Sequence, residues 1–172
     1  MLNRLRQRAS DEGGFTLIEL LVVILIIGIL AAIAIPALLS QKSKANDSAA
    51  KELARTAETT AETYATDHNG DYEGLTMKVL HEYENTIPTE PGNGNGAWLI
   101  ASTAAAASLP VTETALEEGA KGYTVTTEAA STKDEFSITK TAGGEVERTC
   151  TGPAKAAVEA GKTVGGCVGG KW

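Results

Sequence analysis

The sequence predicts an α+β fold in which a long N-terminal helix packs on a small antiparallel sheet. Three observations support this prediction. No charged residue lies between Glu19 and Lys42. After Pro36, residues 40–67 contain neither glycine nor proline. Three short segments of alternating polar and apolar residues lie after residue 120. The first two patterns are typical of helices and the third is typical of strands.

The long helix is expected to run from Phe15 to about Thr66 and to have two different halves. Its first half is apolar on all sides, and roughly 20 such residues span the ~30 Å hydrocarbon core of a bilayer. Its second half, residues 41–69, is amphipathic, and Asn69-Gly70 supplies a stop. Small or apolar residues recur there at helical spacing: Ala45, Ala49, Leu53, Ala57, Ala61 and Tyr64. We expect this stripe to pack on a globular head.

Residues 70–172 form the expected head. The predicted elements before its sheet are a short helix from Leu75-Thr76 to about Tyr83, a loop over 85–96 and a short strand over 98–100. Residues 104–118 favour neither helix nor strand. Alternating runs at 123–127, 136–139 and 146–150 predict an antiparallel meander that is polar on one face. Five apolar residues of these runs are expected to cover the helix stripe: Tyr123, Val125, Phe136, Ile138 and Val146.

Charge and motifs argue against several classes of function. The net charge is −7, and an acidic surface does not attract nucleic-acid phosphates, so no nucleic-acid binding is expected for the isolated domain. The two histidines, His68 and His81, lie outside any zinc-binding motif, and the chain has neither a phosphate-binding loop nor a nucleophile elbow. We therefore expect a protein that is not an enzyme and has no cofactor and no metal site.

Basic residues and cysteines indicate how the chain is placed across a membrane. Arg4, Arg6 and Arg8 precede the apolar run and favour a cytoplasmic N-terminus, although Lys42 and Lys44 follow the run and weaken the asymmetry. Two cysteines, Cys150 and Cys167, then lie outside the cytoplasm in a glycine-rich tail. A pair in an oxidising compartment favours a disulfide over a metal site, and two free thiols are the alternative.

The start of the long helix resembles a known processing junction. Gly13-Gly14 is followed by Phe15, then by Thr16-Leu17-Ile18-Glu19 and the apolar run. Over about residues 1–70 the chain resembles the prepilins of type IV pilins and pseudopilins. The resemblance implies that residues 1–14 are a leader peptide. A prepilin peptidase would cut between Gly14 and Phe15 and methylate the new amino group of Phe15.

The resemblance also implies a pilin-like fold and a structural function. Residues 15–40 would lie in the membrane before assembly and in the filament core afterwards, residues 41–69 would form the amphipathic half of the helix, and residues 70–172 would form the head. The chain would be a subunit of a type IV pilus, a homo-oligomeric helical filament outside the cell. An assembly platform in the inner or cytoplasmic membrane would extract it from the bilayer.

Roles for individual residues follow from the same resemblance. Glu19 would pair with the methylated amine of a neighbouring subunit, and Gly28 and Pro36 would bound a helix segment that loses helicity in the filament. Cys150 and Cys167 would close a C-terminal disulfide loop. For Glu19 the alternative is that the carboxylate only reaches the membrane interface and benefits from the positive end of the helix dipole.

Four other interpretations compete with a pilus subunit. A secretory signal peptide has a shorter apolar region, and a plain membrane anchor does not explain the spacing from Gly14 to Glu19. A major pseudopilin of a type II secretion system shares the N-terminal pattern. In that family a calcium-binding acidic loop near the C-terminus is usual and a disulfide is often absent, so the two cysteines favour a pilin. A membrane-anchored binding module that never polymerises would retain Met1 and would not need Glu19.

Overall fold

The computed structural model divides the chain into two compact units, Met1–Ser40 and Gln41–Trp172, which are described separately. The described residues are 15–92, 96–101, 111–112, 116–117, 119–152, 167 and 169–172. The predicted leader and most of the ambiguous range 104–118 lie outside them.

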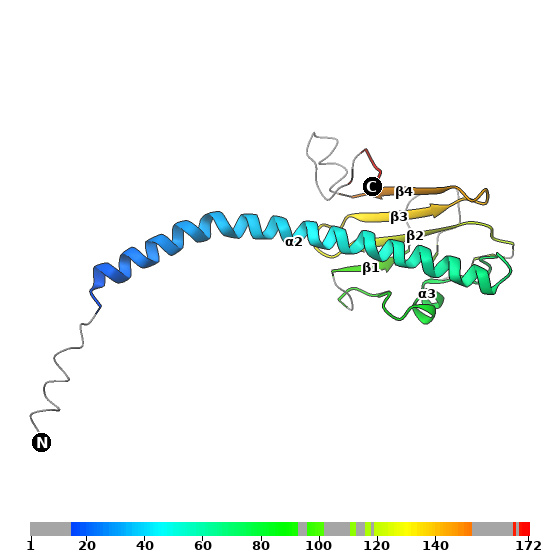
Figure 1. The fold of residues 1–172 in the computed structure, drawn as a ribbon, viewed down its shortest axis with the longest axis horizontal. Helices are drawn as coiled ribbons and strands as arrows, with labels where there is room; N and C mark the ends of the chain where they lie inside the picture. The colour runs from blue at the N-terminus through cyan, green and yellow to red at the C-terminus, as the bar shows by residue number, and fades with distance from the viewer. Residues whose placement is uncertain are drawn as a thin grey trace, which may run out of the picture. The chain divides into compact units, whose positions relative to one another are not determined.

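The predicted long helix is present as α2, which covers Leu17–Asp67 (Figure 1). It ends where the sequence indicates, because Asn69 and Gly70 both adopt positive φ angles, of 57° and 82°. The Gly70 N–H donates a hydrogen bond of 2.7 Å to the Ala65 carbonyl, so the turn satisfies a carbonyl that the helix leaves free.

The described residues of the head form one short helix and one sheet. Helix α3 covers Met77–Tyr83, and the Thr76 side chain caps it by accepting a hydrogen bond from the Val79 N–H. The strands are β1 (Ala97–Ile100), β2 (Tyr123–Ala129), β3 (Glu135–Lys140) and β4 (Val146–Thr151). They form an antiparallel sheet in the order β1-β2-β3-β4 (Figure 1). The α+β fold is therefore confirmed, and β1 extends the predicted three-stranded meander to four strands.

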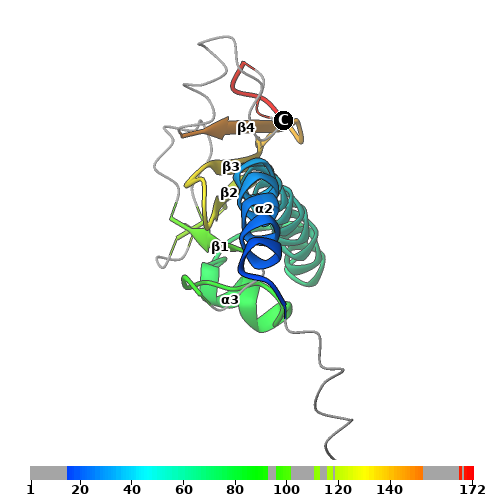
Figure 2. The same cartoon turned by 90° about the vertical axis from the view of Figure 1, so that its left-hand side faces the viewer.

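The second half of α2 lies along one face of the sheet (Figure 2), and most of the predicted stripe packs there. Its buried residues are Asp47, Ala50, Ala54, Ala57, Thr60, Ala61, Tyr64 and Ala65. Of the predicted stripe, Ala57, Ala61 and Tyr64 are buried, and Ala49 and Leu53 are partly buried and pack against the core. Ala45 is exposed, so the prediction was wrong for this residue. Ala50 and Ala54, which the predicted stripe omitted, are also buried. The Ala50 carbonyl accepts a hydrogen bond of 2.8 Å from the Thr127 hydroxyl on β2.

The predicted polar face of the sheet is present, and part of it is buried. Thr124 and Thr126 of β2 are buried, and their hydroxyls pair at 2.9 Å with those of Thr139 and Ser137. Alternation of threonine with apolar residues therefore indicates a strand here without indicating exposure. Val146 was expected in the core but is 39% exposed. The other four predicted core residues of the sheet are fully buried.

A cluster of hydrogen-bonded polar side chains connects the C-terminal part of α2 to the sheet. The Glu62 carboxylate accepts hydrogen bonds from Lys140 (2.6 Å), Tyr123 (2.9 Å) and Tyr72 (3.0 Å). Partial burial alone would raise the pKa of Glu62, but these donors outweigh it and hold the pKa below its usual range. The hydrogen bonds from Lys140 to Glu62 and Tyr72 raise the pKa of the lysine. Burial beside Glu62 raises the pKa of Tyr123 well above its ordinary value, so the phenol remains a donor.

This cluster predicts a loss of stability in acid. A carboxyl with a lowered pKa in the fold stabilises the native state above its unfolded pKa of about 4.3 and stops doing so as the pH falls through the folded value. Lys140, with a raised pKa, contributes throughout that range. Because the Glu62 side chain is 42% exposed, we expect at most about 1 kcal/mol. Urea unfolding at pH 7 and pH 3 should show a smaller loss of stability in Glu62→Gln than in the wild type; equal losses would contradict the assignment.

Gly122 lies where a side chain would collide with the backbone of the next strand. A Cβ built there lies 2.5 Å from the Lys140 carbonyl oxygen, whereas one at Gly143 finds its nearest neighbour at 3.7 Å. We therefore expect Gly122→Ala to lower the free energy of unfolding by about 1–3 kcal/mol through overpacking. Gly143→Ala is the matched control and should change it by less than about 0.5 kcal/mol. Urea unfolding of the two variants checks this, and equal stabilities would contradict it.

Candidate functional site

The first turn of α2 holds the polar residues of the predicted processing junction. Thr16 precedes the helix, and the Glu19 carboxylate accepts hydrogen bonds from the Thr16 N–H at 2.8 Å and from its hydroxyl at 2.7 Å. The Glu19 N–H donates in return to the Thr16 hydroxyl at 3.3 Å. This reciprocal pairing is a capping box. In the single chain, Glu19 is thus held at the start of its own helix.

Phe15 lies next to this box and is 88% exposed. Gly14, on the other side of the predicted cleavage site, lies outside the described residues. Cleavage at Gly14 and methylation of Phe15 therefore stay predictions. The exposure of Phe15 suits them, because neither reaction would require the helix to unfold.

The first half of α2 presents apolar side chains in every direction. Large apolar residues from Leu17 to Leu39 are between 45% and 80% exposed. In the described part of the chain, α2 alone is long and apolar enough to cross a membrane, and its apolar window has no residue buried within the chain. An exposed apolar surface of this extent needs lipid or other protein around it.

Gly28 and Pro36 both lie inside this apolar half, and α2 continues through both positions. A Cβ at Gly28 would meet no atom within 4 Å, so packing within the chain does not require glycine there. Proline lacks the N–H that would bond to the carbonyl four residues earlier, so the ladder is weakened at Pro36. The predicted loss of helicity concerns the assembled filament and stays a prediction.

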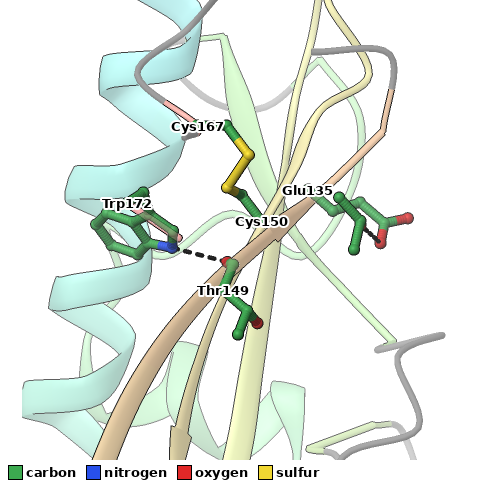
Figure 3. Close-up of a disulfide and its surroundings, with 6 residues drawn as sticks. Glu135, Thr149, Cys150, Cys167 and Trp172 are labelled. Atoms are coloured by element: carbon green, nitrogen blue, oxygen red, sulfur yellow. Dashed lines mark hydrogen bonds between the residues drawn. A yellow bond between two sulfur atoms is a disulfide. The ribbon is translucent and has the colours of Figure 1, made fainter. Parts of the chain in front are cut away.

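In the head, Cys150 of β4 is joined to Cys167 by a disulfide (Figure 3). Both cysteines are 1% exposed and pack in a cluster with Ala50, Phe136 and Ala129. The bond closes a segment with a sequence separation of 17 residues. It therefore fixes the C-terminal end of the chain to the sheet.

Each of the two histidines has a ring nitrogen within hydrogen-bond distance of a backbone carbonyl oxygen. His68 stacks on Tyr64 with ring centroids 3.9 Å apart, and its Nδ1 lies 2.8 Å from the Tyr64 carbonyl oxygen. His81 Nδ1 lies 2.7 Å from the Ile87 carbonyl oxygen. Within the described ranges, no three His, Cys, Asp or Glu side chains gather as a group that could hold a metal ion.

Comparison with known proteins identifies the family. Residues 10–35 match the family described as the prokaryotic N-terminal methylation motif. The fimbrial protein EcpC of Eikenella corrodens is 31% identical over 131 residues, which are 73% of this chain and 80% of EcpC. The chain belongs to the type IV pilin and pseudopilin family. The capping box and the exposed apolar helix are thus features of a pilin-family subunit.

Other relatives match shorter parts of this pilin-family chain. The type IV wide pilus major component PilA4 of Thermus thermophilus is 50% identical over 59 residues, 34% of this chain and 45% of PilA4. The type II secretion system core protein G of Pectobacterium carotovorum is 33% identical over 94 residues, 53% of this chain and 58% of that protein. The chain thus spans about half the length of these two relatives. No solved structure matches it.

Sequence reasoning missed the last residue, Trp172. Its indole N–H donates a hydrogen bond of 2.8 Å to the Thr149 carbonyl on β4 (Figure 3), and its ring meets Phe136 edge-on with centroids 5.8 Å apart. Lys51 and Arg55 of α2 lie over the ring, at 5.9 Å and 5.4 Å from its centroid. A tryptophan at the end of a glycine-rich tail is the sequence signal that indicates such an anchor.

Proposed function

We propose that this chain is the precursor of a type IV pilus subunit. The observation that carries the proposal is the apolar first half of α2. It follows the Phe15–Glu19 sequence, and none of its apolar window is buried within the described chain. Such a helix can be held by lipid before assembly and by the helices of other subunits afterwards. The match to a fimbrial protein over 80% of that protein supports the same function.

In this proposal a prepilin peptidase removes residues 1–14 and methylates Phe15. The subunit waits in the membrane with its N-terminus in the cytoplasm and the head outside. An assembly platform then extracts it into the filament, where neighbouring apolar helices pack around one another. Gly28 and Pro36 fit this step, because both weaken the helix that has to adapt to its neighbours.

The capping box suggests how Glu19 is accommodated before assembly. An unpaired carboxylate in hydrocarbon costs roughly 2.5–3.5 kcal/mol on insertion scales. The Thr16 N–H and hydroxyl already donate to it, so part of this cost is offset within the chain. Exchange of these donors for the amine of a neighbouring Phe15 would then select the assembled register.

N-terminal mass spectrometry of filaments sheared from cells tests the proposal. We expect a chain that begins with methylated Phe15, and we expect deletion of the gene to remove the filaments. Recovery of a chain that still begins with Met1, confined to the membrane fraction, would contradict the proposal and favour a membrane-anchored binding module.

A second candidate is a major pseudopilin of a type II secretion system, which the match to core protein G favours. The disulfide between Cys150 and Cys167 favours the pilus subunit. The same deletion strain distinguishes the two: loss of surface filaments with normal protein secretion supports a pilin, and the opposite result supports a pseudopilin.

A further inference from the structure

The outer edge of β4 is paired with a later segment of the same chain. Residues 169–172, here called the C-terminal strap, run antiparallel to β4 and form a bridge between Thr149 and Lys171. The Cys150 N–H donates a hydrogen bond of 2.8 Å to the Gly170 carbonyl. Because Cys150 belongs to the last strand of the sheet, this N–H points away from β3 and would otherwise be unpaired.

Several contacts hold the strap in place. The disulfide fixes Cys167, two residues before the strap begins. Trp172 is held by its hydrogen bond to Thr149 and by the cations of Lys51 and Arg55 over its ring. At the surface, Lys171 forms an ion pair of 3.1 Å with Glu147. Gly170, Lys171 and Trp172 of the strap are thus joined to β4, and Trp172 also lies beside α2 (Figure 3).

The opposite edge of the sheet is closed in a different way. On β1 the outward-pointing Leu99 N–H donates a hydrogen bond of 2.8 Å to the Pro88 carbonyl. Pro88 belongs to the segment that connects α3 to β1, so this cover is continuous with the strand it protects. Of the two edges, the one on β4 is covered by a segment that a disulfide holds in place.

We infer that the C-terminal strap guards a strand-pairing surface on β4, which accepts the β4 edge of a second copy of this chain when the strap is displaced. An uncovered edge strand presents a row of unpaired N–H and C=O groups and is a template for pairing with another chain. A second β4 is the partner that fits, because two identical antiparallel edges pair by a two-fold arrangement in which each satisfies the other. The inference does not depend on which filament the family member builds.

A truncation after Val168 tests the inference, since it removes the strap and keeps both cysteines. The full chain and the truncated chain are compared in detergent micelles by sedimentation velocity over a wide concentration range. We expect the truncated chain to associate at concentrations lower by at least about tenfold, a difference of 1.4 kcal/mol, with the infrared signature of intermolecular sheet. Association through the apolar helix is common to both chains and cancels in the comparison.

Val146→Pro in the truncated chain is the matched control. Val146 is the first residue of β4 and 39% exposed, and a proline at the start of an edge strand is tolerated while it blocks pairing. We expect this substitution to reverse the association. A truncated chain that keeps its circular dichroism spectrum and associates no more than the full chain overturns the inference.

Hydrogen exchange of the full chain provides a test that needs no variant. The Cys150 amide should be protected in the oxidised protein, and reduction of the disulfide should speed its exchange while the interior amides of β3 remain protected. A Cys150 amide that exchanges like an exposed loop amide in the oxidised protein overturns the inference, whether or not the truncated chain folds.

Discussion

Replacing Glu19 with alanine is expected to leave a cleaved chain that accumulates in the membrane and builds few or no filaments. In the proposed filament the carboxylate pairs with the cationic amine of a neighbouring Phe15. A pair of unit charges 4 Å apart gains about 1 kcal/mol in water and about 4 kcal/mol at an effective dielectric constant of 20. Because each 1.4 kcal/mol is tenfold in an equilibrium, we expect filament yield to fall by more than about tenfold.

Glu19→Gln separates the two functions available to this side chain. The amide oxygen of glutamine can still accept from the Thr16 N–H and hydroxyl, so the capping box is largely retained, but the negative charge is lost. If pairing with the amine drives assembly, the glutamine variant should build as few filaments as the alanine variant. Wild-type numbers of filaments from Glu19→Gln would show that the cap suffices and would contradict the pairing.

Leader cleavage is the internal control for both variants. Immunoblots of membrane fractions should show the mature size at wild-type levels, because the change lies beyond the Gly14–Phe15 bond. Electron microscopy then counts filaments against an equal pool of mature subunit. A fall in filaments matched by a fall in mature subunit would indicate defective processing and not defective assembly.

The long helix was predictable because it is specified locally. Its apolar half follows from composition alone, and its end follows from Asn69-Gly70, which adopt the left-handed conformations that such a pair favours. Helix α3 was likewise predictable from the Thr76 cap. The strands β2, β3 and β4 were found from alternation, since each carries its own pattern and its own turns.

The predictions of burial that failed concern contacts between residues that are distant in sequence. Ala45 and Ala50 are chemically identical, but Ala50 packs in the cluster around Phe136 and Cys150 whereas Ala45 is exposed. Val146 fits the alternating pattern of β4, but it is the first residue of the last strand of the sheet and is 39% exposed. Pattern reasoning treats every alternating strand as equivalent, whereas position in the sheet determines burial.

In the candidate site, too, some features were predicted from the sequence and others were not. Phe15 and Glu19 were found from their spacing, but the pairing of Glu19 with Thr16 was not anticipated, although the Thr-x-x-Glu sequence that forms a capping box is present. Trp172 was missed because a residue at a chain end carries no periodic signal. Its partners Lys51 and Arg55 lie more than a hundred residues away, and only the fold brings them together.

Removing the disulfide is expected to lower the free energy of unfolding of the head by about 3 kcal/mol, the value for closing a loop of about 15 residues in the chain-entropy model. The closed segment here has a sequence separation of 17 residues. Urea unfolding followed by tryptophan fluorescence measures the change. Both tryptophans, Trp98 and Trp172, lie in the head, so the signal does not report on the apolar helix.

Two versions of the experiment separate the crosslink from the packing of the sulfur atoms. Reduced wild-type protein loses the crosslink and keeps both side chains, whereas the double variant Cys150→Ala/Cys167→Ala also loses buried volume in the cluster around Phe136. We expect the reduced protein to be destabilised and the double variant to be destabilised further. Intact mass should first show that the oxidised chain is lighter than the reduced chain by two hydrogens. Two freely alkylatable thiols in the folded, unreduced chain, or equal unfolding midpoints with and without reductant, would contradict this prediction.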